Sequence, residues 1–111
     1  MQAISFGLIR VPTPGEPVQI TADTSLNAAM LMVRTVPGFT GKTYLGLVGM
    51  TKSASTMSGV IRVLSEPSFG PQDGEVLPPA GRGQGNVLRV SDYWIDADVP
   101  NEGVIVTCFV A

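Results

Sequence analysis

The sequence predicts an all-β domain, an antiparallel β-sandwich of jelly-roll type with about seven short strands. Short runs rich in valine, isoleucine, threonine and aromatic residues recur along the chain. Glycine and proline, 13 and 9 residues in all, separate these runs at roughly 8- to 12-residue intervals. No segment has the periodicity of a convincing helix, and 111 residues suffice for a single domain with an ordinary core.

Strands are expected in the first half of the chain at residues 3–11, 18–22, 28–36 and 43–50. Gly7 interrupts the first, and the prolines of 12–17 form a turn. Segments 28–36 and 43–50 are interpreted as neighbouring antiparallel strands joined by a turn at 37–42. Both faces of segment 28–36 are largely apolar, whereas a sheet with one wet face alternates apolar and polar residues. We therefore expect a second sheet to cover one face and another protein to cover the other.

In the second half, strands are expected at residues 60–64, 87–99 and 104–111. Period-two alternation places Tyr93, Ile95, Ala97 and Val99 on one face and Asp92, Trp94, Asp96 and Asp98 on the other. A four-residue hairpin turn at 100–103 follows. Residues 65–86, rich in glycine and proline, contain a brief extended piece around Val76 and Leu77. This segment is interpreted either as a surface loop or as an arm that becomes ordered against a neighbouring subunit.

The composition favours a protein that is buried in an assembly. Hydrophobic residues make up 44% of the chain and charged residues only 14%, against roughly 25% in a typical soluble domain. A net charge of −2 argues against nucleic-acid binding. No apolar run is long enough for a membrane helix, and the N-terminus lacks the features of a signal peptide. Cys108, the single cysteine, is expected to be a buried thiol in a protein made in a reducing compartment.

The residues needed for common catalytic sites are missing. Without histidine, the chain cannot form a Ser-His-Asp or Cys-His site or a His-dependent zinc site. No pair of carboxylates is obviously placed for glycoside hydrolysis. The sequence GFTGKT at 38–43 lacks the first glycine of a phosphate-binding loop, because Val36 stands there, and a strand follows it. We therefore predict a hairpin turn at this place, and neither an enzyme nor a cofactor.

Two further features allow more than one interpretation. Asp92, Asp96, Asp98, Asn101 and Glu102 form an acidic cluster. A solvated face or an interface rim is favoured over a cation site, since the spacing is not that of an EF-hand. Trp94, the single tryptophan, is interpreted as an interface anchor, a sugar platform or a core residue.

Several motifs together resemble a known class of proteins. They are PVQIT at 17–21, MVR at 32–34, PGFTGKTYLG at 37–46, VSDYWIDAD at 90–98 and EGV at 102–104. In this order they resemble small structural proteins of tailed bacteriophages. The resemblance covers most of the chain but not residues 65–86, and its motifs concern turns and packing.

The resemblance implies a virion component, made in the host cytoplasm and placed on the capsid surface. The expected role is capsid decoration, in which a trimer binds the major capsid protein and staples neighbouring subunits; a tail part or the base of a head fibre is a further possibility. Candidate interface residues are Met30, Met32 and Trp94, with Phe69 and Val76 in the long arm. The alternative hypothesis is a carbohydrate-binding module that uses Trp94 and the acidic strand face.

Overall fold

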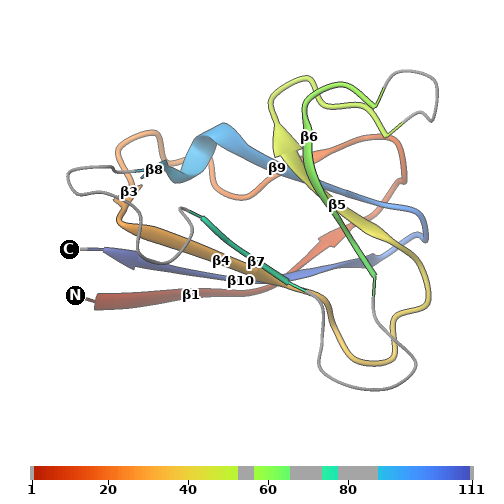
Figure 1. The fold of residues 1–111 in the computed structure, drawn as a ribbon, viewed down its shortest axis with the longest axis horizontal. Helices are drawn as coiled ribbons and strands as arrows, with labels where there is room; N and C mark the ends of the chain where they lie inside the picture. The colour runs from red at the N-terminus through yellow and green to blue at the C-terminus, as the bar shows by residue number, and fades with distance from the viewer. Residues whose placement is uncertain (1, 53–56, 66–73, 78–87, 111) are drawn as a thin grey trace.

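The computed structural model describes residues 2–52, 57–65, 74–77 and 88–110. They form ten strands and one 3-10 turn (Figure 1). The strands are β1 (Gln2–Val11), β2 (Val18–Gln19), β3 (Asn27–Ala28), β4 (Met30–Arg34), β5 (Thr43–Leu47), β6 (Val60–Leu64), β7 (Gly74–Leu77), β8 (Leu88–Arg89), β9 (Tyr93–Ala97) and β10 (Glu102–Val110), and the 3-10 turn is η1 (Val90–Asp92).

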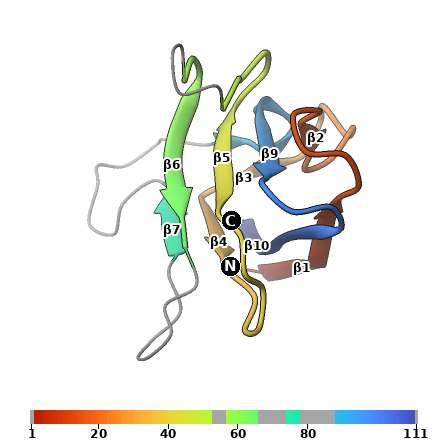
Figure 2. The same ribbon diagram turned by 90° about the vertical axis from the view of Figure 1, so that its right-hand side faces the viewer.

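Eight of the strands form two four-stranded sheets. Sheet A has the order β1-β10-β4-β7 and sheet B the order β2-β9-β5-β6, while β3 and β8 form a small separate pair. All pairs are antiparallel. Figure 2 shows β1, β10 and β4 below β2, β9 and β5, with β6 and β7 following one another along one side. The all-β prediction and the antiparallel sheets are confirmed.

The strand order can be compared with that of the predicted jelly roll. Without the short β3 and β8, and with the remaining strands renumbered in chain order, the sheets read 1-8-3-6 and 2-7-4-5. Consecutive strands then alternate between the sheets for most of the chain, which is consistent with a jelly roll of two Greek keys.

Side chains from both sheets fill the space between them. Leu31 and Val33 of β4 are buried, whereas the residues that alternate with them point outward. The buried cluster comprises Val11, Ile20, Ala28, Leu31, Val33, Leu45, Leu64, Val90, Ile95, Ala97, Val104, Val106 and Cys108. Cys108 is therefore a core residue, as expected, and burial raises the pKa of its thiol.

The two predicted hairpins are wrong. β4 lies between β10 and β7, while β5 lies between β9 and β6, so these strands belong to different sheets. The turn after β9 likewise leads from sheet B to β10 in sheet A. A turn was correctly expected near both places, although Glu102 and Gly103 of the expected turn 100–103 belong to β10. A turn alone does not determine whether the next strand pairs with the previous one or crosses to the other sheet.

Gly7 does not end the first strand. It has a φ of 68° at a β-bulge, where Ser5 and Gly7 lie opposite consecutive residues of β10 and Phe6 is the extra residue. Glycine adopts this left-handed conformation without steric cost, so β1 continues to Val11.

Candidate interaction surface

The outer face of sheet A, directed away from the core, is the candidate surface that contains most of the predicted interface residues. Its residues are Ala3, Ser5, Leu8 and Arg10 of β1, Ile105, Thr107 and Phe109 of β10, Met30, Met32 and Arg34 of β4, and Val76 of β7. No described strand or helix covers this face. A sheet face in contact with water is normally polar, so this one has the character of an interface.

Cross-strand pairs make the apolar part of this face continuous. Met32 lies opposite Thr107 of β10 and Val76 of β7, and Met30 lies opposite Phe109. Directly opposed side chains on one face are in contact distance. Each of these side chains is only half-buried, since its neighbours in the sheet cover its sides but nothing described covers its outer end. Methionine adapts its shape to a partner, which suits an interface.

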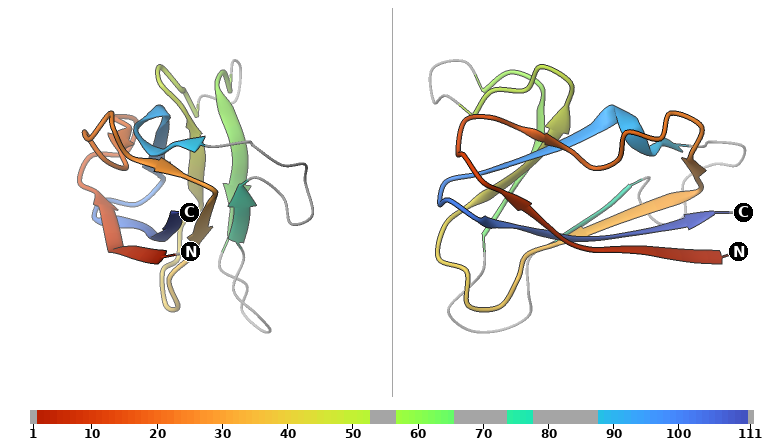
Figure 3. Two further views of the ribbon diagram at one scale, coloured as in Figure 1. Left: turned by 90° about the vertical axis from the view of Figure 1, so that its left-hand side faces the viewer. Right: turned by 180° about the vertical axis from the view of Figure 1, so that it is seen from behind.

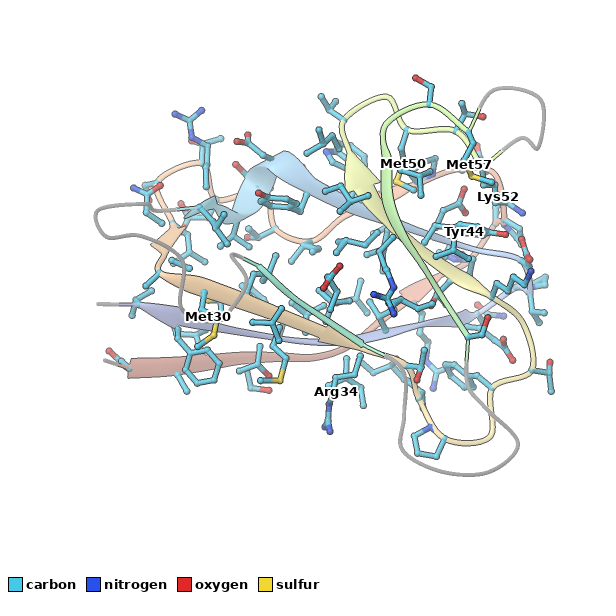
Figure 4. The ribbon with its side chains drawn as sticks, viewed as in Figure 1. Met30, Arg34, Tyr44, Met50, Lys52 and Met57 are labelled. Carbon is cyan, nitrogen blue, oxygen red and sulfur yellow. The ribbon has the colours of Figure 1, made fainter. Side chains whose placement is uncertain are left out.

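Positive charge limits this apolar area at one end. Arg34 lies at the end of β4 remote from Met30 (Figure 4). Arg10 donates a hydrogen bond of 2.8 Å to the carbonyl of Asn101 and stands 5.8 Å from the ring centre of Phe39, in cation–π range. The face thus has an apolar centre and a cationic border.

The structure brings together three of the five predicted interface residues. Met30, Met32 and Val76 share the outer face of sheet A. Trp94 belongs to sheet B, and Phe69 lies outside the described residues. Ile105 and Phe109 also lie on this face but were not among the predicted interface residues, although the segment 104–111 is apolar at nearly every position.

Trp94 belongs neither to the core nor to an open platform. It is half-buried on the outer side of sheet B, opposite Gln19 of β2 and Gly46 of β5. Met50 and the backbone of Gly59 lie where a Cβ of Gly46 would be, so the chain between β5 and β6 folds over this part of the sheet.

The predicted solvated acidic face is wrong for Asp96 and Glu102. Asp96 is 1% exposed, because the turn between β1 and β2 covers it. Its Oδ1 accepts hydrogen bonds from the N–H groups of Gly15 at 3.0 Å and Ala97 at 2.7 Å. Period-two alternation gives the correct face for Asp96, but it cannot show that a distant turn covers that face.

Glu102 holds the turn that contains the GFTGKT sequence. It is 9% exposed; Oε2 accepts the N–H of Thr40 at 3.0 Å and Oε1 that of Gly41 at 2.9 Å. Successive N–H groups of this kind can bind an anion. Here the protein's own carboxylate occupies them, which agrees with a structural turn.

Asp98 forms a cluster with Tyr44 and Lys52. The Tyr44 hydroxyl donates to the carboxylate at 3.0 Å, and the Lys52 ammonium lies 2.8 Å from Oδ1. Burial and the bond to Asp98 raise the pKa of Tyr44 to about 12. Burial alone would raise the pKa of Asp98, but the hydrogen bonds from Lys52 and Tyr44 lower it overall. Figure 4 shows Tyr44 and Lys52 side by side. With its carboxylate paired in this way, Asp98 contributes to a structural contact.

A second group of exposed apolar residues lies in β5, in β6 and in the described parts of the connection between them. Val48 is 72% exposed, and Leu47, Met57 and Ile61 are also exposed. These side chains lie on sheet B and are separate from the outer face of sheet A. Leu47 and Val48 lie in the expected strand 43–50 and Ile61 in the expected strand 60–64, and none of the four was named as an interface candidate.

Within the described ranges, no three side chains of the metal-binding kind come together, and no helix is long and apolar enough to cross a membrane. No family model, no curated protein and no solved structure matches this chain.

Proposed function

We propose that this chain is a non-enzymatic structural protein of a virion, a capsid decoration protein that works by docking rather than by chemistry. The observation that carries the proposal is the apolar outer face of sheet A, centred on Met32 with Val76 and Thr107 as cross-strand neighbours. The resemblance to structural proteins of tailed bacteriophages supplies the partner, the major capsid protein.

Physical reasoning supports docking through this face. Association removes apolar area from water, at about 25 cal/mol per Å² before the entropic cost of binding. Contacts repeated around a symmetric shell then add up to a large avidity even when each is weak. An oligomer of this chain, whatever its number of copies, would bring several such faces to the shell together.

Co-sedimentation with shells of the virus that encodes the chain tests the proposal. Met32→Glu places a charge in the middle of the face, and we expect it to weaken binding roughly tenfold or more, because the carboxylate loses water on docking. Val48→Glu adds the same charge at an exposed position just after β5, away from sheet A, and is the matched control.

The wild-type chain and Val48→Glu should sediment with shells at equal concentrations. Both variants should keep the wild-type circular dichroism spectrum, since both positions lie outside the core. A wild-type chain that does not bind the shells, or a Met32→Glu chain that binds as well as wild type, contradicts the proposal.

A further inference from the structure

The free edge of β1 is the longest sheet edge in the described structure. β1 has ten residues and pairs only with β10, whereas the other end strands, β2, β6 and β7, have two, five and four. Proteins usually block pairing at edges with charges, prolines, β-bulges or short strands, and β1 has one of these devices, the bulge at Phe6. Residues 2–9, QAISFGLI, contain neither charge nor proline. Figure 3 shows this strand, in red, beside β10, in blue.

Contacts at the C-terminal end of β1 show which backbone groups point to this edge. The carbonyl of Val11 accepts the N–H of Asn101 at 2.9 Å, and the carbonyl of Ile9 lies against Gly103. Both therefore point toward β10. Successive residues of a strand direct their backbone N–H and C=O groups to opposite sides. The N–H and C=O groups of Leu8 and Arg10 therefore point to the free edge.

The β-bulge shifts this pattern by one residue. With Phe6 as the extra residue, the outward-pointing groups on the N-terminal side belong to Ala3 and Ser5. The side chains shift in the same way, so those of Ala3 and Ser5 lie on the outer face of sheet A, as does that of Leu8. The edge thus has two residues with outward N–H and C=O groups on each side of the bulge, Ala3 and Ser5 before it and Leu8 and Arg10 after it.

We propose that a second copy of this chain pairs with the edge of β1, antiparallel, about a two-fold axis between Phe6 and Gly7. Ala3 then lies opposite Arg10 of the second copy, and Ser5 opposite Leu8. The members of each pair both have outward N–H and C=O groups and side chains on the same face. The four pairs give about two hydrogen bonds each, and the two A sheets become one continuous sheet.

The side chains fit this register. On the core side, Ile4 lies opposite Ile9 of the second copy, and both already pack against the core cluster. Arg10 faces Ala3, so no like charges oppose one another. A two-fold axis lets the same edge serve both copies and places each bulge opposite the other, which is why a second copy is the occupant. The inference concerns self-association alone and does not require capsid binding.

Two double variants test the register. Ser5→Lys with Leu8→Lys places lysine opposite lysine at two positions of the proposed contact, whereas Ser5→Glu with Leu8→Lys places glutamate opposite lysine. Both lose the bond from the Gly7 N–H to Ser5 Oγ equally. Sedimentation over a range of concentrations should give a wild-type dimer and a glutamate–lysine dimer. The dissociation constant of the double-lysine dimer should be roughly tenfold higher, or more, than that of the wild-type dimer.

Amide hydrogen exchange of the wild-type chain gives a second measurement that needs no variant. The N–H groups of Leu8 and Arg10 should exchange more slowly as the concentration rises and the dimer forms. A trimer, a monomer at every concentration, two variants with equal dissociation, or rapid exchange of these amides in a dimer overturns the inference. The proposed docking function is tested separately, because Met32→Glu leaves the edge of β1 unchanged.

Discussion

Glu102 allows a quantitative test of how the turn at 37–42 is held. Glu102→Ala removes the carboxylate that accepts the N–H groups of Thr40 and Gly41 at 3.0 and 2.9 Å. A hydrogen bond to a charged group contributes about 1.5–3 kcal/mol. Thr40 is exposed, so water replaces part of its bond, whereas Gly41 is half-buried beside Val99. We therefore expect a loss of about 2–4 kcal/mol.

Urea unfolding followed by circular dichroism measures this loss. The slope of the free energy against urea should not change, because the variant exposes no additional surface on unfolding. Glu102→Gln keeps one acceptor oxygen but turns an NH₂ group toward the second N–H, so its loss should be about half that of the alanine variant.

Glu16→Ala is the matched control. Glu16 is exposed in the turn between β1 and β2, and its removal should change the free energy of unfolding by less than about 0.5 kcal/mol. If Glu102→Ala also falls within that range, the carboxylate does not hold the turn.

Three further predictions concern the interior. The pKa of Tyr44 is raised to about 12 in the folded state, so the wild-type chain should lose stability as the pH rises from about 10 to about 12. Tyr44→Phe cannot lose this proton and should lose less stability over the same range, measured by urea unfolding at each pH. Equal losses in the two chains contradict this. Gly103→Ala should lower the melting temperature markedly, because a Cβ there meets the Ile9 carbonyl; an unchanged temperature would show that β1 can move away. Cys108 should react with a thiol reagent only when the chain unfolds, and rapid reaction of the folded chain would contradict its burial.

Local patterns in the sequence predicted much of the fold. The segment 60–64 coincides with β6, and period-two alternation correctly placed Ile95 and Ala97 in the core. These features depend on neighbouring residues and on one buried face. Met30 and Met32 were named as interface residues, but the pattern did not show which face of segment 28–36 is buried, because both faces are apolar. In the structure the two methionines lie on the outer face.

Long-range arrangement could not be predicted in this way. The GFTGKT turn has hairpin chemistry, but Glu102, far along the chain, binds its N–H groups while the chain crosses between sheets. Asp96 has a polar side chain at a position that alternation assigns to the surface, yet the turn around Gly15 buries it. Both outcomes depend on residues more than 60 positions apart in sequence.

The pairing of β1 with β10 has a consequence for how the chain reaches its native state. Among the described strands, the first in the sequence, β1, pairs only with the last, β10. Topologies dominated by such distant pairings fold slowly. Until β10 pairs with it, both edges of β1 are open to other unfolded chains, so the refolding yield should fall as the concentration rises.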